Sequence, residues 1–236
     1  DDLQNARAIR NSLPKASLDR HILAWAIALS GDPSVPSHEI AQAAADLPAW
    51  PGLAALRRNF ERALYRANPP AKDVIAAFAK STPQTPVGAA ILARVNVAQG
   101  NAQAAHTVLA PLWRKAVMSA DDEQAIISEF GSLLTADDHF HRMSAMLYAE
   151  RPASAGRVAK LANSEPLFAA WSAAIRKDAK TAGFVKVVPA EAQKLAGYQF
   201  AKALWLRKTG KLKDAAKVMA EAPQDAASLI DPDAWW

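Results

Sequence analysis

Proline placement constrains the fold of this chain more than any other feature. Proline lacks a backbone amide donor and is tolerated best in the first turn of a helix. Here the prolines fall mainly between segments whose apolar residues recur at helical spacing, while alternating runs of β-branched and aromatic residues are nearly absent. The pattern therefore predicts an all-α chain with no sheet, whose helices are separated by Pro14, Pro33, Pro36, Pro48, Pro51, Pro69, Pro70, Pro83, Pro86, Pro152, Pro189, Pro223 and Pro232.

The helices can be placed from their apolar periodicity and their start signals. Ser37, Ser119 and Thr135 are each followed by an acidic residue within one turn, which predicts that their side-chain oxygens cap the unpaired amides there. We expect helices near residues 2–13, 17–29, 37–46, 53–67, 71–80, 87–99, 101–117, 120–133, 136–149, 152–162, 165–177, 190–208 and 212–221.

One internal repeat is visible when Ala93 to Leu109 is laid over Ala203 to Met219. Gly100 then meets Gly210, and alanines match on both sides of the glycine. Glycine adopts a positive φ at little cost, and alanine lets two helices approach closely, so each copy reads as a helical hairpin. The spacing resembles the tetratricopeptide pattern without most of its aromatic positions. Such hairpins bury their faces by stacking, which predicts a curved superhelix.

Composition indicates a folded chain and excludes several kinds of chemistry. The 236 residues are 51% hydrophobic, enough for a sizeable core, and no linker divides them, so we expect a single domain over residues 1–236. The lack of cysteine excludes disulfides and cysteine nucleophiles. The longest apolar runs are far shorter than the about 20 residues of a membrane span. No glycine-rich loop precedes a Lys-Ser or Lys-Thr pair, so nucleotide binding has no support.

The formal charge of +5 favours anionic partners, although it also serves solubility. Arg58, Arg62 and Arg66 are spaced to form a basic stripe on one helix face, interrupted only in part by Glu61. The stripe could bind carboxylates of a sugar or peptide ligand, and the alternative is a solvated or salt-bridged face. A basic cluster from Lys202 to Lys217 has the same two readings. Single-stranded nucleic acid is a remote third reading of this cluster, because interleaved stacking aromatics are few, so nucleic acid is not an expected partner.

The remaining polar clusters read as structural. Asp137, Asp138, His139 and His141 carry metal-compatible groups, but neighbouring helix positions point about 100° apart, so a capped helix start that begins at Thr135 explains the acids better. Isolated histidines form no recognisable catalytic set, and we expect no metal, no cofactor and no catalytic residue. The tryptophans inside alanine-rich helices, Trp25, Trp113, Trp171 and Trp205, are expected in the core.

Several short motifs occur in an order that carries a family resemblance. They are the segment from Phe130 to His139 with Arg142, Trp50-Pro51-Gly52 with Leu56-Arg57-Arg58, Leu206-Arg207-Lys208 before Gly210, and the terminal Asp233-Ala234-Trp235-Trp236. Together they resemble the superhelical scaffold of soluble lytic murein transglycosylases of the α-proteobacterial branch. The resemblance covers nearly the whole chain and implies a right-handed, U-shaped α-superhelix in the periplasm.

The resemblance also implies that catalysis and scaffolding belong to different domains. In the family, a catalytic domain cleaves peptidoglycan between N-acetylmuramic acid and N-acetylglucosamine, a lyase reaction that leaves a 1,6-anhydro end without metal or cofactor. Its acid is a Glu followed by Ser, with a Gly-Leu-Met-Gln stretch further on, whereas the pairs Ser128-Glu129 and Ser164-Glu165 here have the reverse order. We therefore expect a non-catalytic scaffold, truncated before the catalytic domain, which supports that domain and positions glycan strands.

The terminal tryptophans have a particular place in this interpretation. In the family the scaffold continues beyond this point, so Trp235 and Trp236 are expected to be partly exposed, as half of an interface that could also support a weak homodimer. The sequence leaves a rival function open, a stand-alone tetratricopeptide-like adaptor that binds a peptide in its concave groove. A groove lined by Asn and Lys at matching positions of successive hairpins would favour the adaptor.

Overall fold

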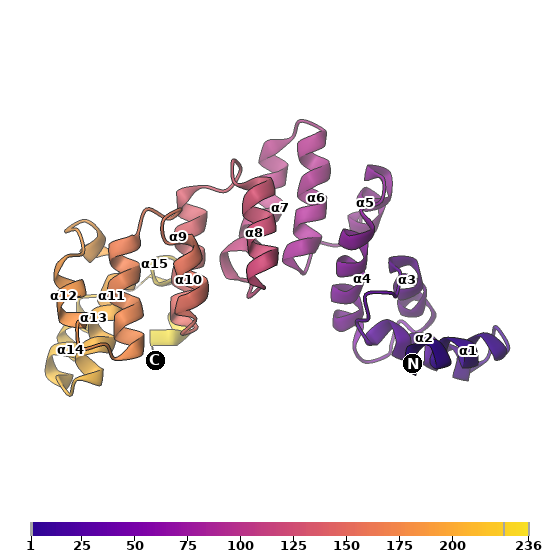
Figure 1. The fold of residues 1–236 in the computed structure, drawn as a ribbon, viewed down its shortest axis with the longest axis horizontal. Helices are drawn as coiled ribbons and strands as arrows, with labels where there is room; N and C mark the ends of the chain where they lie inside the picture. The colour runs from indigo at the N-terminus through magenta and orange to yellow at the C-terminus, as the bar shows by residue number, and fades with distance from the viewer. Residues whose placement is uncertain (1, 224, 236) are drawn as a thin grey trace. The chain divides into compact units, whose positions relative to one another are not determined.

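The computed structural model describes residues 2–223 and 225–235, with the side chain of Ala227 excepted. All regular secondary structure in these ranges is helical, which confirms the predicted all-α class (Figure 1). The first unit of the chain contains α1 (Asp2–Ser12), α2 (Leu18–Leu29), α3 (Ser37–Asp46), α4 (Leu53–Ala67), α5 (Ala71–Phe78), α6 (Pro86–Ala98) and most of α7 (Ala102–Lys115).

The second unit contains the other helices, and contact clustering places the boundary between the two units at Leu112 and Trp113. A single domain over residues 1–236 therefore stays a prediction. The helices of this unit are α8 (Ala120–Phe130), α9 (Ala136–Tyr148), α10 (Pro152–Val158), α11 (Glu165–Arg176), α12 (Thr181–Lys186), the 3-10 turn η1 (Ala192–Lys194), α13 (Ala196–Lys208), α14 (Leu212–Ala220), α15 (Ala226–Leu229) and the 3-10 turn η2 (Pro232–Trp235).

Each predicted helix has a counterpart, and the differences are local. The helix expected over 190–208 is broken, because Leu195 is extended with φ −72° and ψ 142° and separates η1 from α13. Periodicity missed α12, α15 and η2, which are too short to display a helical repeat. Pro111 departs from the general rule and lies inside α7.

Two of the three predicted helix caps are present. Thr135 and Asp138 form a reciprocal capping box: the Asp138 amide donates to Thr135 Oγ1 at 3.2 Å, and the Thr135 amide donates to Asp138 Oδ2 at 2.8 Å. Ser119 Oγ accepts from the Asp122 amide at 3.0 Å. The prediction for Ser37 is wrong, since Ser37 is the first helical residue and Pro36, which has no side-chain oxygen, holds the cap position.

The predicted repeat is confirmed in its turns. Gly100 and Gly210 have φ values of +77° and +79°, and a backbone bond of the same type closes each turn, Asn101 N to Asn96 O at 2.8 Å and Lys211 N to Leu206 O at 2.9 Å. These bonds satisfy carbonyls left free at the helix end. In the second unit, α13 and α14 then pack against each other through Ala203, Leu206, Ala215 and Val218.

Three further turns of this type occur where no glycine marks them, at Glu150, Asn163 and Lys177, whose φ values are 53°, 51° and 56°. The bonds that close them are Arg151 N to Met146 O at 2.8 Å, Ser164 N to Ala159 O at 3.0 Å and Asp178 N to Ala173 O at 3.0 Å. A side chain in this left-handed region costs about 1–2 kcal/mol. Surrounding packing, rather than residue preference, therefore holds these positions.

Aromatic side chains fill the core of each unit. In the first unit the Trp25 and Trp50 rings meet edge to face at 5.8 Å. In the second unit Trp171 is fully buried against Tyr148, with their ring centroids 4.6 Å apart. The core prediction is confirmed for Trp25, Trp113 and Trp171, whereas Trp205 is half-buried. Within the described ranges, no helix combines the length and apolar character needed to cross a membrane.

Candidate functional site

Arg58, Arg62 and Arg66 lie exposed on one face of α4, as their spacing predicts. No described residue forms a hydrogen bond or ion pair with their guanidinium groups. Arg66 acts on Asp32 through its charge: the pKa of Asp32 is lowered chiefly by hydrogen bonds to Ser34 and to a smaller extent by the charges of Arg7 and Arg66. The row is therefore a set of solvated cations with free donors, which can pair with carboxylates.

Glu61, which the sequence places within this row, does not neutralise it. Its carboxylate is fully buried and accepts hydrogen bonds from the Thr85 amide at 2.7 Å and the Thr85 hydroxyl at 2.6 Å. Arg57 Nε donates to the same carboxylate at 2.8 Å. The acid thus holds Thr85, the residue that caps the start of α6, and forms no ion pair with the exposed arginines.

An apolar hollow of about 330 Å³ lies beside Arg57 and between α3 and α4, lined by Ile40, Leu53 and Phe60 among others. The Arg57 guanidinium lies 4.8 Å from the centroid of the Phe78 ring and pairs with Glu61, so it brings no free charge to the hollow. This hollow therefore has little to orient a polar ligand.

Arg142, one of the residues that carry the resemblance, is fully buried and serves the fold. Its guanidinium pairs with Glu123 at 2.6 Å, donates to the carbonyls of Trp113 and Ala116 at 2.8 and 2.9 Å, and lies 4.6 Å from the Trp113 ring centroid. Arg157 donates to both oxygens of Glu123, from Nε to Oε1 at 3.1 Å and from Nη2 to Oε2 at 3.0 Å. The network ties α8, α9, α10 and the segment after α7 together.

The acids and histidines after Thr135 are likewise engaged in structure. Asp138 is fully buried, closes the capping box and pairs with Arg114 at 2.8 Å. His139 is buried with its ring edge to face against Trp113, and this burial lowers the pKa of His139. His141 turns to the surface and contacts Asp137. Among the described residues, no three side chains of metal-ligand type converge.

Trp235 does not have the exposure expected of it. Its side chain is 8% exposed, its Nε1 donates to Tyr148 Oη at 3.2 Å, and its ring meets Phe200 edge to face at 5.3 Å. The expectation of a partly exposed Trp235 is therefore wrong, because η2 returns the ring to the core of the second unit. Burial raises the pKa of Tyr148 to about 12. Trp236, the other predicted contact, lies outside the described residues.

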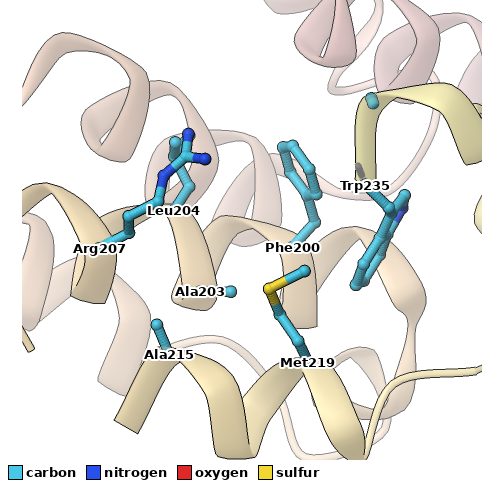
Figure 2. A pocket seen from close by; sticks show the side chains of 8 residues that line it. Phe200, Ala203, Leu204, Arg207, Ala215, Met219 and Trp235 are labelled. Atoms are coloured by element: carbon cyan, nitrogen blue, oxygen red, sulfur yellow. The ribbon is translucent and has the colours of Figure 1, made fainter. Parts of the chain in front are cut away.

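A small pocket adjoins Trp235, between α13, α14 and η2, with a volume of about 60 Å³. Figure 2 shows Phe200 and Trp235 on one side of it and Arg207 on the other, with Met219 reaching up from α14. Arg207 is exposed, and no described residue pairs with it. The pocket therefore combines apolar walls with one free cation.

His21 acquires a partner that its sequence neighbours did not reveal. Its Nδ1 lies 3.0 Å from Asp46 Oδ2, while Gln42 donates to the other oxygen of Asp46 at 2.6 Å. These residues line a polar hollow of about 260 Å³ between α1, α2 and α3. The nearby Asp19 takes no part in the pair. Only the packing of α2 on α3 brings the histidine and its acid together.

Comparisons with protein-family models, with curated proteins and with solved structures found no match to this chain. Its function is therefore inferred from the residues and from their geometry.

Proposed function

We propose that this chain is a non-catalytic scaffold domain of a periplasmic soluble lytic transglycosylase, which holds peptidoglycan strands through Arg58, Arg62 and Arg66. The observation that carries the proposal is that these three exposed arginines form no hydrogen bond or ion pair with a described residue. Peptidoglycan is a fitting ligand because its stem peptides carry free carboxylates. Guanidinium groups pair with carboxylates through two parallel hydrogen bonds.

The spacing of the row suits a ligand with repeated charges. Eight residues separate Arg58 from Arg66, which corresponds to about 12 Å along a helix. A single exposed ion pair contributes only about 0.2–1 kcal/mol, so one carboxylate would be held weakly. Several carboxylates on one strand would act together, and the binding would weaken as salt rises.

The motifs behind the resemblance support a positional role. Thr135 and Asp138 start a helix, and Arg142 joins three helices through Glu123, so these residues hold the scaffold rather than react. In this proposal the cleavage that leaves a 1,6-anhydro end is carried out by the parent enzyme's catalytic domain, without cofactor. The partners are the glycan strands and that domain.

The proposal includes the architecture that the repeat predicts. Stacked hairpins with glycine turns at Gly100 and Gly210 would form one right-handed superhelix over residues 1–236. Small-angle scattering tests this, because a superhelix gives a radius of gyration above the about 18 Å of a compact globule of this length. Analytical ultracentrifugation tests the predicted weak homodimer. Because Trp235 is buried, the C-terminal end offers less exposed apolar surface for that contact than the sequence predicted.

Binding to purified peptidoglycan sacculi tests the proposed site. The variant to compare with the wild type replaces Arg58, Arg62 and Arg66 by Gln. A matched control with the same charge change replaces the exposed Lys15, Lys72 and Lys80 by Gln. We expect about tenfold weaker cosedimentation for the arginine variant and little change for the control, from three exposed pairs of about 0.5 kcal/mol each.

Two outcomes would contradict the proposal. If both variants lose the same amount of sacculus binding, net charge and not the arginine row accounts for the interaction. If the wild type does not bind sacculi at all, the chain has no such binding site. The family assignment has its own test: a longer form of the protein that includes the following gene sequence should release 1,6-anhydro-muropeptides, and this chain should not. Capture of a defined peptide with no release by either form would favour the adaptor.

A further inference from the structure

The pocket beside Trp235 has one polar feature, the guanidinium of Arg207. Its neighbour Lys208 is already engaged, with Nζ donating to Ile175 O at 2.9 Å and lying 4.0 Å from Glu150. Arg207 has no such partner among residues 2–223 and 225–235. The helix that carries it, α13, holds no acidic residue at all. The pocket therefore presents a guanidinium without an ion-pair partner, which favours an anionic ligand.

The walls of the pocket select an apolar group next to that anion. Phe200 and Trp235 form one side and Leu204 and Met219 contribute aliphatic surface, while Ala203 and Ala215 leave the space open (Figure 2). The Trp235 ring is held in place by its bond to Tyr148. A ligand would meet a wall that is already ordered, so little side-chain freedom would be lost on binding.

The volume limits what fits. A water molecule occupies about 10–15 Å³ on the same scale, so a pocket of about 60 Å³ holds roughly four to six atoms of that size. The methyl group, α-carbon and carboxylate of a terminal alanine amount to about five heavy atoms. An aromatic or long aliphatic side chain beside the carboxylate would extend out of the pocket.

We infer that this pocket binds the C-terminal carboxylate of a short peptide that ends in alanine. Arg207 pairs with the carboxylate, and the alanine methyl group packs between Phe200 and Met219. The choice of peptide rests on the function proposed above, since peptidoglycan stem peptides are short and end in free carboxylates. The preference for an acid over its amide rests on Arg207 alone.

Methionine methyl NMR can test the inference directly. The chain has Met118, Met143, Met146 and Met219, and only Met219 lines the pocket, so the other methyl signals serve as internal controls. The probes are N-acetyl-alanyl-alanine, with either L- or D-alanine at its end, and the corresponding C-terminal amides. We expect the acids to shift the Met219 signal with a dissociation constant on the order of a millimolar, and the amides to bind about fivefold more weakly.

Substitutions at Arg207 test whether this residue binds the carboxylate. Arg207→Gln should reduce acid binding to the level of the amide, and Arg207→Lys should fall between them, because lysine keeps the charge but loses the planar fork. Lys213→Gln, an exposed change on α14 outside the pocket, should leave both affinities unchanged. Unchanged Met143 and Met146 signals confirm that each variant is folded.

Three results would overturn the inference: equal binding of acid and amide, acid binding that survives Arg207→Gln, or acetate and inorganic phosphate shifting Met219 as strongly as the peptide acids. Sacculus binding separates this inference from the proposed function. If Arg207→Gln loses the peptide while sacculus binding still depends on Arg58, Arg62 and Arg66, both stand. If the peptide binds but sacculi do not, only the proposed function fails.

Discussion

The buried pair of Arg142 and Glu123 offers the sharpest test of how this fold is held together. Arg142→Met removes the guanidinium while keeping an unbranched side chain of useful length. The change eliminates the 2.6 Å pair with Glu123 and leaves the carbonyls of Trp113 and Ala116 without their donor. Arg157→Met is the matched comparison, because it removes the other cation from the same carboxylate.

The expected magnitudes differ because the two arginines differ in burial. Removing one partner of a fully buried pair typically costs about 3–5 kcal/mol. Arg157 would still contact Glu123, so we expect Arg142→Met to lie at the lower end, at about 3 kcal/mol. The Arg157 side chain is 34% exposed, and Glu123 still pairs with Arg142 when Arg157 is replaced. Arg157→Met should therefore cost about 1 kcal/mol or less.

Urea unfolding followed by circular dichroism measures both costs by linear extrapolation. Hydrogen exchange of the α9 amides gives a local reading that does not require the two units to unfold together. A cost below about 1 kcal/mol for Arg142→Met, or equal costs for the two variants, would refute the view that burial makes Arg142 the central residue of this network.

Three further predictions concern other positions. Burial lowers the pKa of His139 below its ordinary 6.5, so the unfolded chain takes up the proton first as pH falls. Stability that is present above about pH 6.5 should therefore be lost as the pH falls below that value. His139→Phe should flatten this part of a profile of melting temperature against pH, and an unchanged slope would contradict the prediction. Glu150→Gly should stabilise by about 0.5–1 kcal/mol in urea, because glycine accepts the positive φ of 53°, and a loss of stability would count against strain there. Gly88→Ala would place its methyl group against the buried Glu61 carboxylate and should cost about 2 kcal/mol, whereas a neutral result would mean that Glu61 can move freely.

Local chemistry made much of this fold predictable. Apolar periodicity and proline placement located the longer helices, because both act over a few neighbouring residues. Thr135 and Asp138 met as a capping box since they lie one turn apart, and Gly100 and Gly210 took positive φ values because glycine alone does so at little cost. The exposed arginine row on α4 followed from helical spacing in the same way.

Contacts between residues far apart in the chain required the tertiary structure. Glu61 binds Thr85 at the start of α6 and does not pair with the arginine row. His21 pairs with Asp46 on another helix, and the position of η2 buries Trp235. Glu150 adopts a left-handed turn that its side chain disfavours. In each case the deciding energy comes from burial and pairing with partners that no local pattern identifies. The sequence determined where helices form and which faces are polar, whereas only packing decided which charges stay free to bind a ligand.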